Sequence, residues 1–542
     1  MNELHARTAA VLGGCLLLLA AGPGAAQAVA QDGADRLPGW PQWGRDGTRN
    51  MVSSATGLPS DFHPGEFIGV TDEIDSATSR NVKWIAKLGS QSYGNPTVAG
   101  GRVFIGTNND TPRDPRYQGD RSCVYALDEE TGEFLWQLNI PKLGTGKVSD
   151  WEYLGICSSP AVEGDRVYLV TNRCEVMCLD ADGLADGNDG PFKDEGAYAA
   201  GPGKPPVEAR PTDADIIWSM NMIDECGVFP HNITSSSVLV TEDKVWAATS
   251  NGVDYGHVET PAPFAPCLVA VDKETGALVG EEASGLSQRI YHSNWSSPAH
   301  LKTDELELVI FGGPDGWVYA FETEPVEDED GYGILQEAWR FDANPPSYRV
   351  DENGKTRKYA TRDGPSEVLG TPVVHGGKVY ALIGQDPEHG EGKGNLVCID
   401  PTGKGDVTKT HAVWSYDEIH RSMSTLSIHD GLLFAADYSG FVYCLDAETG
   451  EEYWVHDTMG HIWGSTLVAD GKVYIGNEDG YVTILPVSRE LGEDDVGEVD
   501  MQAPIYSSPI AANGVLYIAT MTHLFAIASD SPGGEVSSER NE

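Results

Sequence analysis

Basic residues are scarce in this sequence. The 542 residues include only 36 Lys and Arg against 83 Asp and Glu, which gives a formal net charge of −47. Phosphate backbones repel such a chain, so we expect no nucleic-acid partner. The apolar fraction of 40% is nevertheless typical of a globular protein rather than of a disordered chain.

Long apolar runs are missing as well. The run from Ala9 to Ala21 is shorter than the roughly 20 residues of a transmembrane helix, and no later stretch comes near that length, so no transmembrane segment is expected. Basic side chains precede the run, and small residues with a cleavage site at Ala28-Val29-Ala30 follow it. Residues 1–30 are therefore predicted to be a signal peptide. The mature protein is expected to be exported to the periplasm or out of the cell, with outer-membrane association as one option.

Common catalytic motifs are not found. The sequence has no Walker P-loop, no G-x-S-x-G elbow and no H-E-x-x-H motif, so nucleotide-binding, serine-hydrolase and zincin functions have no support. Among the cysteines of the mature chain, Cys157 and Cys226 are the candidates for a disulfide. Three others stand at one repeated position and are expected to fill the core: Cys178, Cys398 and Cys444.

What the chain does contain is a repeat. Its units share a small-residue step, a short apolar strand, a turn, two strands with V-Y patterns, the triplet T-G-E and a Trp, most clearly from Gly94 to Trp136 and from Ser424 to Trp454. Alternating apolar residues between Gly and Asn/Asp turns indicate antiparallel strands, four to each unit. The first strands follow eight anchor positions: Pro96, Pro160, Val238, Pro298, Pro372, Leu426, Thr466 and Pro509.

The two ends of the repeat region complement each other. The last unit runs out at Ile527 without a Trp strand, whereas residues 81–86 are a Trp strand without a unit. Joining the two closes a ring and removes exposed sheet edges. We therefore predict an all-β, eight-bladed β-propeller of four-stranded antiparallel blades, closed by an N-terminal strand. A β-solenoid is the alternative.

This prediction divides the chain into four parts. The signal peptide is followed by an N-terminal extension at 31–80 and by a single propeller at 81–528. A tail at 529–542, rich in Ser, Gly and Glu, is expected to be disordered.

The pattern A-x-D-x-x-T-G-x-x-x-W, here Ala126 to Trp136, resembles the tryptophan-docking repeat of the pyrroloquinoline quinone (PQQ) β-propellers. The stretch from Trp40 to Asp46 is similar to the start of secreted PQQ-like propellers. In such repeats Gly supplies the positive φ of a tight turn, and the Trp of one blade lies against the next blade. The resemblance implies the fold. It allows either a quinoprotein dehydrogenase or a scaffold without cofactor, such as the propeller lipoprotein of outer-membrane protein assembly.

Several dehydrogenase features are lacking. Methanol-dehydrogenase-like enzymes have two adjacent cysteines beside the quinone, and many relatives have a C-x-x-C-H haem module; this chain has neither. The calcium-binding Glu, Asn and Asp of those enzymes do not map onto it residue by residue. PQQ with calcium therefore stays an alternative.

The repeat also predicts a site. The loops that lead into the first strands should converge on one mouth of the central channel, and residues five to seven before the anchors are unusually rich in His. The predicted ligand-binding residues at the mouth are His231, Asn232, His292, Asn294, Trp295, Glu367, His420, Arg421, His461 and Trp463, with Tyr93 and Tyr506 nearby. Imidazole, guanidinium and aromatic groups together suit an anionic, flat or metal-bound ligand, although polar loops of this kind also serve structure alone.

Long insertions support the mouth as the working face. Loops at 108–122, 251–266 and 384–392 join second to third strands on that side, and the second of them carries His257. Two acidic insertions, 181–215 and 322–336, leave from the opposite side and are expected to be solvated and mobile.

Three functions are consistent with these patterns. The first is an exported propeller that acts as a scaffold of the cell envelope for a small-molecule ligand or a protein partner. The second is a PQQ-dependent oxidoreductase with the quinone at the channel mouth, held by Arg421 and the histidines. The third is a metal-dependent enzyme that uses some of His231, His292, His420 and His461.

Overall fold

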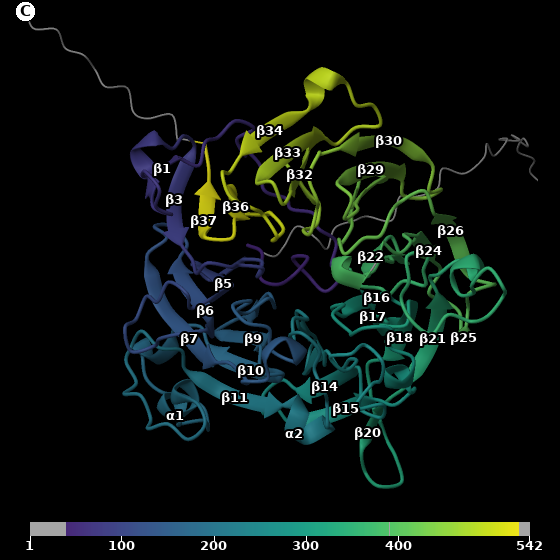
Figure 1. Ribbon diagram of the computed structural model, residues 1–542, viewed down its shortest axis with the longest axis horizontal. Helices are drawn as coiled ribbons and strands as arrows, with labels where there is room; N and C mark the ends of the chain where they lie inside the picture. Colours follow the sequence, from purple (N-terminus) through teal and green to yellow (C-terminus); the bar gives the residue numbers. More distant parts are fainter. Residues whose placement is uncertain (1–38, 390, 530–542) are drawn as a thin grey trace, which may run out of the picture. The chain divides into compact units, whose positions relative to one another are not determined.

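The computed structural model describes residues 39–389 and 391–529. The predicted signal peptide at 1–30 and residues 530–542 of the predicted tail lie outside these ranges. In the described part of the chain, eight antiparallel sheets surround a central channel (Figure 1). The predicted all-β, eight-bladed β-propeller is confirmed.

Each of the first seven blades contains four main strands in sequence order from the channel outward. The first four blades are β4–β7 (Thr97–Ala99, Arg102–Asn108, Arg121–Asp128, Phe134–Pro141), β8–β11 (Ala161–Glu163, Arg166–Val170, Glu175–Asp180, Ile216–Asn221), β12–β15 (Leu239–Val240, Lys244–Ala248, Leu268–Asp272, Leu278–Glu282) and β16–β18 with β21 (Ala299–Lys302, Glu307–Gly312, Trp317–Glu322, Glu337–Asp342). The next three are β22–β24 with β26 (Val373–His375, Lys378–Leu382, Leu396–Ile399, Ala412–Tyr416), β27–β30 (Ser427–His429, Leu432–Ala436, Phe441–Asp446, Glu452–Asp457) and β31–β34 (Leu467–Ala469, Lys472–Gly476, Tyr481–Pro486, Gly497–Asp500). Every predicted anchor stands directly before a first strand.

The eighth blade closes the ring. Its inner strands β35–β37 (Ile510–Ala512, Val515–Ala519, His523–Ile527) come from the end of the described chain, and its outer strand β3 (Val82–Lys87) comes from the beginning. The antiparallel pairing of β3 with β37 runs from Val82↔Ile527 to Lys87↔His523. This is the predicted closure, and it leaves no blade without a neighbour.

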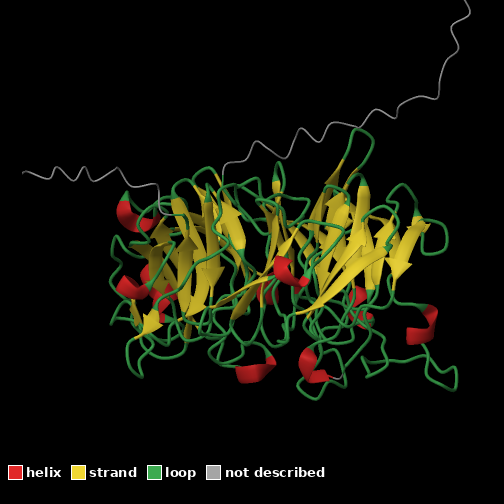
Figure 2. Cartoon of the chain, turned by 90° about the horizontal axis from the view of Figure 1, so that it is seen from above, coloured by secondary structure: helices red, strands yellow, loops and turns green. Residues whose placement is uncertain are grey.

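Helices are short and lie at the margins (Figure 2). They are α1 (Glu195–Ala200), α2 (Met222–Cys226) and the 3₁₀ turns Ser76–Thr78, Gly146–Val148, Gly183–Ala185, Leu286–Gln288, Pro346–Tyr348, Pro387–His389 and Glu493–Asp495. None of the helices in the described ranges has the length and apolarity needed to cross a membrane. A small hairpin of β1 (Glu66–Phe67) and β2 (Ile74–Asp75) precedes the ring.

Tryptophans join neighbouring blades as the repeat predicted. The indole N–H of Trp84 in the eighth blade donates to the carbonyl of Glu129 in the first, and a Cβ on Gly132 would lie 2.6 Å from the same indole. Gly132 has a φ of 72°, so the turn requires a residue without a side chain on both grounds. The same arrangement recurs for Trp218 on the Gly276 turn and for Trp414 on the Gly450 turn.

The segment from Trp40 to Ser53 closes the channel at the end opposite the mouth. It hydrogen-bonds to every blade, in the third blade at the anchor Val238 and in the others within the first strand. Its hydrogen-bond partners in blades one to eight are Val98, Val162, Val238, Pro298 with His300, Val374, Ile428, Val468 and Ala511. We refer to residues 40–53 as the floor segment.

Arg49 is the centre of the floor segment and is completely buried. Its Nε donates to the carbonyl of Pro298 at 2.8 Å, and its Nη2 donates to the carbonyl of Val238 at 2.8 Å. Its Nη1 donates to the Trp43 carbonyl at 2.7 Å and to Oε1 of Gln42 at 3.2 Å. Burial lowers the pKa of this guanidinium to about 9.

The two acidic insertions carry regular structure, which corrects the expectation that they are mobile loops. Within residues 322–336, β20 (Gly333–Leu335) pairs in parallel with β15 of the preceding blade and in antiparallel with β19 (Val326–Glu327). Within residues 181–215, α1 packs against β7. Both insertions therefore contain paired or helical backbone, although most of residues 322–332 are exposed to solvent.

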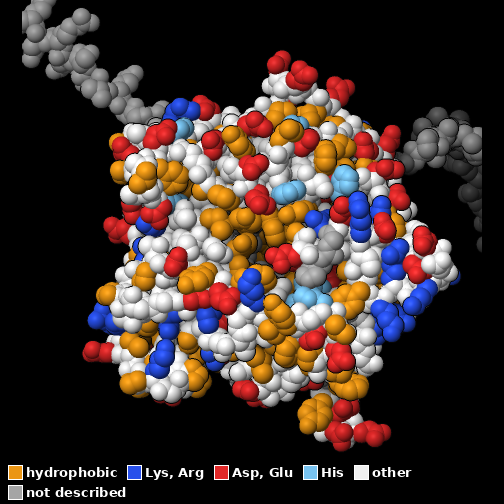
Figure 3. Space-filling view, viewed as in Figure 1, with side chains coloured by type: hydrophobic (Ala, Val, Ile, Leu, Met, Phe, Trp, Pro, Cys, Tyr) orange, Lys and Arg blue, Asp and Glu red, His pale blue; other side chains and the backbone are white. Residues whose placement is uncertain are grey.

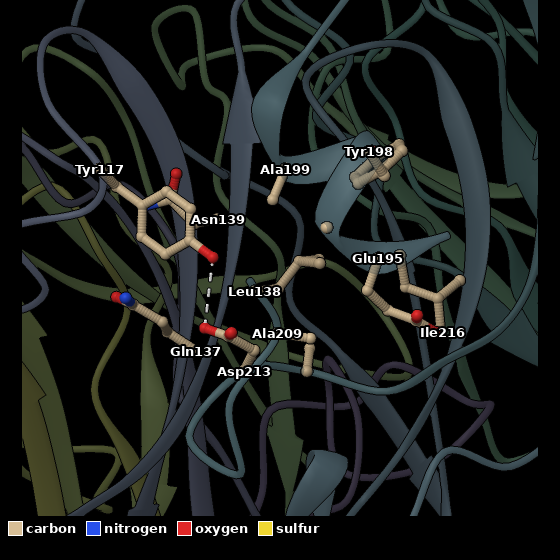
Figure 4. Close-up of a pocket in the computed structure, with 12 residues that line it drawn as sticks. Tyr117, Gln137, Leu138, Asn139, Glu195, Tyr198, Ala199, Ala209, Asp213 and Ile216 are labelled. Atoms are coloured by element: carbon tan, nitrogen blue, oxygen red, sulfur yellow. Dashed lines mark hydrogen bonds between the residues drawn. The ribbon is translucent and has the colours of Figure 1, made fainter. Parts of the chain in front are cut away.

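A small cavity lies under α1 (Figure 4). Tyr117 points from the loop between β5 and β6 toward Asp213, and its hydroxyl donates to Asp213 at 3.3 Å. Arg116 adds a two-pronged ion pair with the same carboxylate, at 2.7 and 2.9 Å. The cavity measures about 20 Å³, which is room for roughly one water molecule. This region therefore serves to attach the insertion to the first blade.

The described cysteines are all free, including Cys157 and Cys226. The proposed disulfide between these two is therefore wrong. The expected role of the repeated cysteines as core residues is confirmed, because Cys178, Cys398 and Cys444 are all buried.

Candidate functional site

The predicted site residues occupy separate parts of the mouth. We describe three of them: a histidine cluster between the third and fourth blades, an arginine pocket near the sixth, and an aromatic funnel at the channel axis. Hydrophobic side chains gather at the centre of this face, and histidines lie around them (Figure 3).

The histidine cluster consists of His231, His257 and His292. His231 and His292 lie on the loops that lead into β12 and β16, and His257 comes from the insertion between β13 and β14. The Nε2 atom of His292 is 2.9 Å from Nε2 of His231 and 3.1 Å from Nε2 of His257. One nitrogen of each ring lies within 4.8 Å of the others, so the three are close enough to bind one metal ion.

Hydrogen bonds orient the first of these rings. Nδ1 of His231 is 2.6 Å from the Val253 carbonyl. A carbonyl only accepts, so this nitrogen carries the proton, and Nε2 of the neutral ring keeps its lone pair. The close approach of the rings depends on Gly252, where a Cβ would lie 2.5 Å from Cβ of His231 and 2.7 Å from the His292 carbonyl oxygen.

Glu367 lies beside the cluster, and its side chain is buried. It shares with His257 and His292 the lining of a cavity of about 100 Å³, together with Asp386. Among the described residues, neither carboxylate oxygen of Glu367 has a hydrogen-bond partner of normal geometry. Burial raises the pKa of this carboxyl well above its usual range, and the backbone N–H of His292 offsets only part of that rise.

His420 and His461 do not join the cluster. His420 is exposed, and its Nδ1 is 2.8 Å from Oδ2 of the buried Asp437, which also accepts from the Tyr443 hydroxyl at 2.7 Å. His461 is exposed and stacks on Tyr438 with a ring separation of 4.5 Å. The predicted group of four histidines from four blades is therefore split.

Arg421 lines the arginine pocket, a cavity of about 500 Å³ that also contains four carboxylates (Asp363, Glu391, Asp417 and Glu418). Its guanidinium lies 4.7 Å from the centre of the Tyr438 ring. Its Nη1 atom is buried and has no hydrogen-bond partner within the described ranges. Burial lowers the pKa of this guanidinium.

The aromatic funnel is a cavity of about 220 Å³ on the channel axis. Tyr93, Trp463 and Tyr506 line its upper part. The two tyrosine rings are tilted with a separation of 4.9 Å, and Trp463 makes an edge contact with Tyr506 at 5.4 Å. Trp43 of the floor segment lines it too, and its indole N–H donates to Thr371 at 3.0 Å. None of the described residues that line this cavity carries a charge.

A ring of short polar side chains forms the funnel wall. In six places the side chain of the residue before an anchor accepts the backbone N–H of the residue before a neighbouring anchor. The accepting residues are Ser237, Ser297, Thr425, Ser465, Ser508 and Asn95. These hydroxyl and amide oxygens are thus engaged in joining blades. The aromatic rings remain as the groups that offer contact to a ligand.

The remaining predicted residues support the loops. Asn294 accepts the backbone N–H of Ser250 at 2.8 Å and donates to the Asn251 carbonyl at 2.8 Å. Trp295 donates from its indole to the Ile233 carbonyl at 3.1 Å and lies 4.9 Å from the His292 ring. Asn232 has a φ of 60° and holds neighbouring loops through its backbone.

The funnel does not fit PQQ. That cofactor is a planar tricyclic quinone with three carboxylates, so it requires cationic partners, and its calcium ion requires carboxylates. The funnel lining supplies neither. Arg421 lies instead in a separate pocket, where Arg362, Lys393 and four acidic side chains also line the wall, so the pocket offers an anionic ligand no net positive charge.

Sequence reasoning missed several residues of the mouth. His257 was noted only as part of an insertion, because the insertion lies outside the repeat phase that selected the other histidines. Trp43 and Arg49 belong to a segment before the first repeat, where the repeat has no predictive value. The opening motif from Trp40 to Asp46 was the available signal for the floor segment.

Comparison with known proteins identifies the family. The model of the family described as outer membrane protein assembly factor BamB matches residues 76–296, 347–456 and 392–495, more than half of the chain. The chain belongs to this family. The matched residues include strands of seven blades, whereas the strands of the fourth blade lie in the gap between the matched segments.

Individual relatives are distant. BamB of Moranella endobia (strain PCIT) is 21% identical over 426 residues, which are 77% of this chain and 82% of that protein. The crystal structure of BamB from Moraxella catarrhalis is 15% identical with a TM-score of 0.48, covering 82% of this chain and 97% of that one. The quinohemoprotein alcohol dehydrogenase ADHIIG from Pseudomonas putida HK5 is 12% identical with a TM-score of 0.54, covering 91% and 82%. At this identity the last likeness extends to the fold alone.

Proposed function

We propose that this protein is a binding scaffold of the cell envelope that holds a protein partner at the mouth of its propeller. The observation that carries the proposal is the aromatic funnel: a neutral cavity closed below by Trp43 and bordered above by Tyr93, Trp463 and Tyr506. Clustered aromatic side chains around a concave, uncharged centre are typical of the anchor sites in protein interfaces. Membership of the BamB family supports a protein partner.

The size of the funnel favours one inserted side chain over a whole cofactor. Small-molecule sites usually measure about 300–1,000 Å³, and the funnel measures about 220 Å³. An aromatic or aliphatic side chain on a partner surface would fill the funnel, and the burial of its apolar surface would favour binding. Six side-chain oxygens of the wall already accept backbone N–H groups between blades, and an apolar guest leaves those bonds intact.

Location in the envelope has separate support. The predicted signal peptide implies export, and the name of the family and of the Moranella endobia relative refers to the outer membrane. Outer-membrane association is therefore part of this proposal. A dehydrogenase function is disfavoured because the funnel chemistry does not fit PQQ.

Site-specific photo-crosslinking in envelopes of the native host tests the proposal. A photoreactive residue at Tyr506 should yield a discrete crosslinked protein, and the additional change Trp463→Ala should reduce its yield several-fold. The matched control is a photoreactive residue at Tyr332, an exposed aromatic in the insertion between β18 and β21. Equal crosslinking at both positions, or a yield that is indifferent to Trp463→Ala, would contradict a partner at the mouth.

A further inference from the structure

We propose that His231, His257 and His292 bind one divalent transition-metal ion through their Nε2 atoms, with the Glu367 carboxylate and water completing its surroundings. The site is separate from the aromatic funnel, and the inference does not depend on the proposed partner. It rests on the geometry of the three rings, on the fixed orientation of one of them, and on the cavity beside them.

The spacing of the nitrogens fits coordination to one ion. Two nitrogens bound at ~2.1 Å lie about 3.0 Å apart at a right angle and about 3.4 Å apart at a tetrahedral angle. The contacts of His292 Nε2, at 2.9 Å to His231 and 3.1 Å to His257, are close to the first value. Three rings in this arrangement occupy one side of an ion and leave its other side open.

Hydrogen bonding among the rings alone explains this arrangement less well. His231 presents a lone pair at Nε2 because its Nδ1 donates to Val253. A proton on Nε2 of His292 points at only one of the two neighbouring nitrogens, and a lone pair there opposes the lone pair of His231. A cation between the three Nε2 atoms interacts favourably with all of them.

Contacts within the protein also orient the three histidines before any metal ion binds. The His231 Nδ1–H bond to a backbone carbonyl is the outer contact that commonly orients a metal-binding histidine. His257 adopts a φ of 54°, a strained value for a residue with a side chain, and Asp254 fixes its loop by accepting the backbone N–H groups of Val258 at 2.8 Å and Glu259 at 3.1 Å. The absence of a Cβ at Gly252 lets the His231 and His292 loops approach.

The cavity beside the cluster provides the second, independent observation. It measures about 100 Å³, which corresponds to roughly three water molecules. Glu367 lines it with a buried carboxylate whose oxygens have no hydrogen-bond partner of normal geometry within the described ranges. An uncompensated carboxylate facing a cavity next to three imidazoles supplies the negative charge that a divalent cation requires.

The ligand set defines the class of metal. Imidazole nitrogens suit zinc, copper, iron and nickel, whereas calcium and magnesium prefer oxygen ligands. Three protein ligands with room for water are characteristic of open sites rather than of closed structural ones. We therefore expect Zn²⁺ or Co²⁺ to bind at one ion per chain with water in the open positions.

Metal titration of the exported, untagged protein tests the inference. The protein is stripped with a chelator, and Co²⁺ and Zn²⁺ are added in excess NaCl and Mg²⁺, so that the acidic surface is saturated with competing ions. Equilibrium dialysis with metal analysis should give one Co²⁺ per chain, and the visible spectrum of Co²⁺ should show nitrogen ligation. Zn²⁺ should displace the Co²⁺ and abolish that spectrum.

Variants separate the site from the rest of the surface. His292→Gln should weaken binding by roughly 100-fold or more, since even the loss of a residue that only orients a ligand costs about 10–100-fold. His257→Ala removes a half-buried ligand from a loop and provides a second test should the first variant fail to fold. His461→Gln, a change at an exposed histidine of the same mouth, should leave binding unchanged.

Two outcomes would overturn the inference. One is binding of several ions per chain that all three variants leave unaltered, which would assign the metal to the acidic surface. The other is no binding of Co²⁺ or Zn²⁺ by a folded wild-type protein at micromolar concentrations.

Discussion

The two ends of the channel use arginine in opposite ways. At the floor, Arg49 is fully buried, and each of its donor nitrogens bonds to a backbone carbonyl. At the mouth, Arg421 stacks on Tyr438, and its buried Nη1 has no partner in the described part of the chain. A guanidinium whose bonds are all made within the protein holds blades together, whereas one that lacks a bond is available to a ligand.

The same contrast extends beyond the arginines. The floor segment hydrogen-bonds to every blade, so most of its polar groups hold the ring together. The mouth carries groups whose bonding is incomplete or strained, such as the Glu367 carboxylate and the His257 backbone. Stability should therefore be sensitive to change at the floor, and binding should be sensitive to change at the mouth.

The largest effect is expected at the floor. Arg49→Met retains much of the side-chain volume but leaves the carbonyls of Trp43, Val238 and Pro298 buried without their donor. Unfolding by urea should show a loss of at least about 3 kcal/mol in the free energy of unfolding. A loss below about 1 kcal/mol would mean that water or neighbouring groups replace the guanidinium, and the contrast between the two ends would fail.

Acid should weaken the ring at His523, on the closing strand β37. Burial lowers the pKa of His523 from 6.5 in the unfolded chain to about 4. Between these pH values the imidazole is protonated in the unfolded state but neutral in the folded state. The contribution of His523 to the free energy of unfolding is therefore fully present above about pH 6.5 and decreases as the pH drops toward 4. The loss should reach about 3 kcal/mol.

Urea unfolding between pH 7 and pH 4 measures the contribution of His523 to the free energy of unfolding. His523→Gln should flatten that part of the profile, and His461→Gln at the exposed rim should not. A profile that is identical in wild type and His523→Gln would place the acid-sensitive group elsewhere.

An intermediate effect is expected at Gly252. Gly252→Ala brings a Cβ within 2.5 Å of Cβ of His231 and should cost about 1–2 kcal/mol of stability. It should also separate the rings and weaken Co²⁺ binding several-fold in equilibrium dialysis. Gly256→Ala in the same insertion is the matched control, because its nearest contact would be 3.4 Å away, at a flexible carboxylate. Unchanged Co²⁺ affinity in the folded Gly252→Ala protein would show that the spacing of these loops is not critical.

The smallest effect on stability is expected at Arg421. Arg421→Met removes a partly exposed charge with an incomplete set of hydrogen bonds, so the free energy of unfolding should change by less than about 0.5 kcal/mol. Comparison with Arg49→Met in the same urea assay makes this the direct counterpart of the first prediction. A loss similar to that of Arg49→Met would abolish the distinction between floor and mouth.

The sequence was sufficient for the ring but not for the site. Eight anchors and a recurrent Trp determine the blades and their closure, because each blade repeats the same order of strands and turns. Repeat phase also identified His231, His292 and Glu367, which lie around one small cavity or beside it. It selected His420 and His461 by the same rule, and these lie apart.

The difference arises in the insertions. Convergence of the cluster depends on His257 and on the lack of a side chain at Gly252, and both belong to an insertion that lies outside the repeat pattern. The bonding state of a group such as Glu367 depends on packing from several blades, which no local pattern records. The position of a residue within the repeat gives its place around the ring, whereas the conformations of the loops determine which side chains come into contact.

The closing pair of β3 and β37 also determines the order in which the ring can be completed. These strands lie at opposite ends of the described chain, so their contact is among the most distant in sequence that the fold contains. Contacts of this kind carry the largest loop-closure entropy and form slowly. Seven blades can assemble from neighbouring residues as the chain emerges, while the eighth must wait for its last strand. Until then the nascent protein is an open arc with two unpaired edges, the form that is most exposed to chaperones and to aggregation.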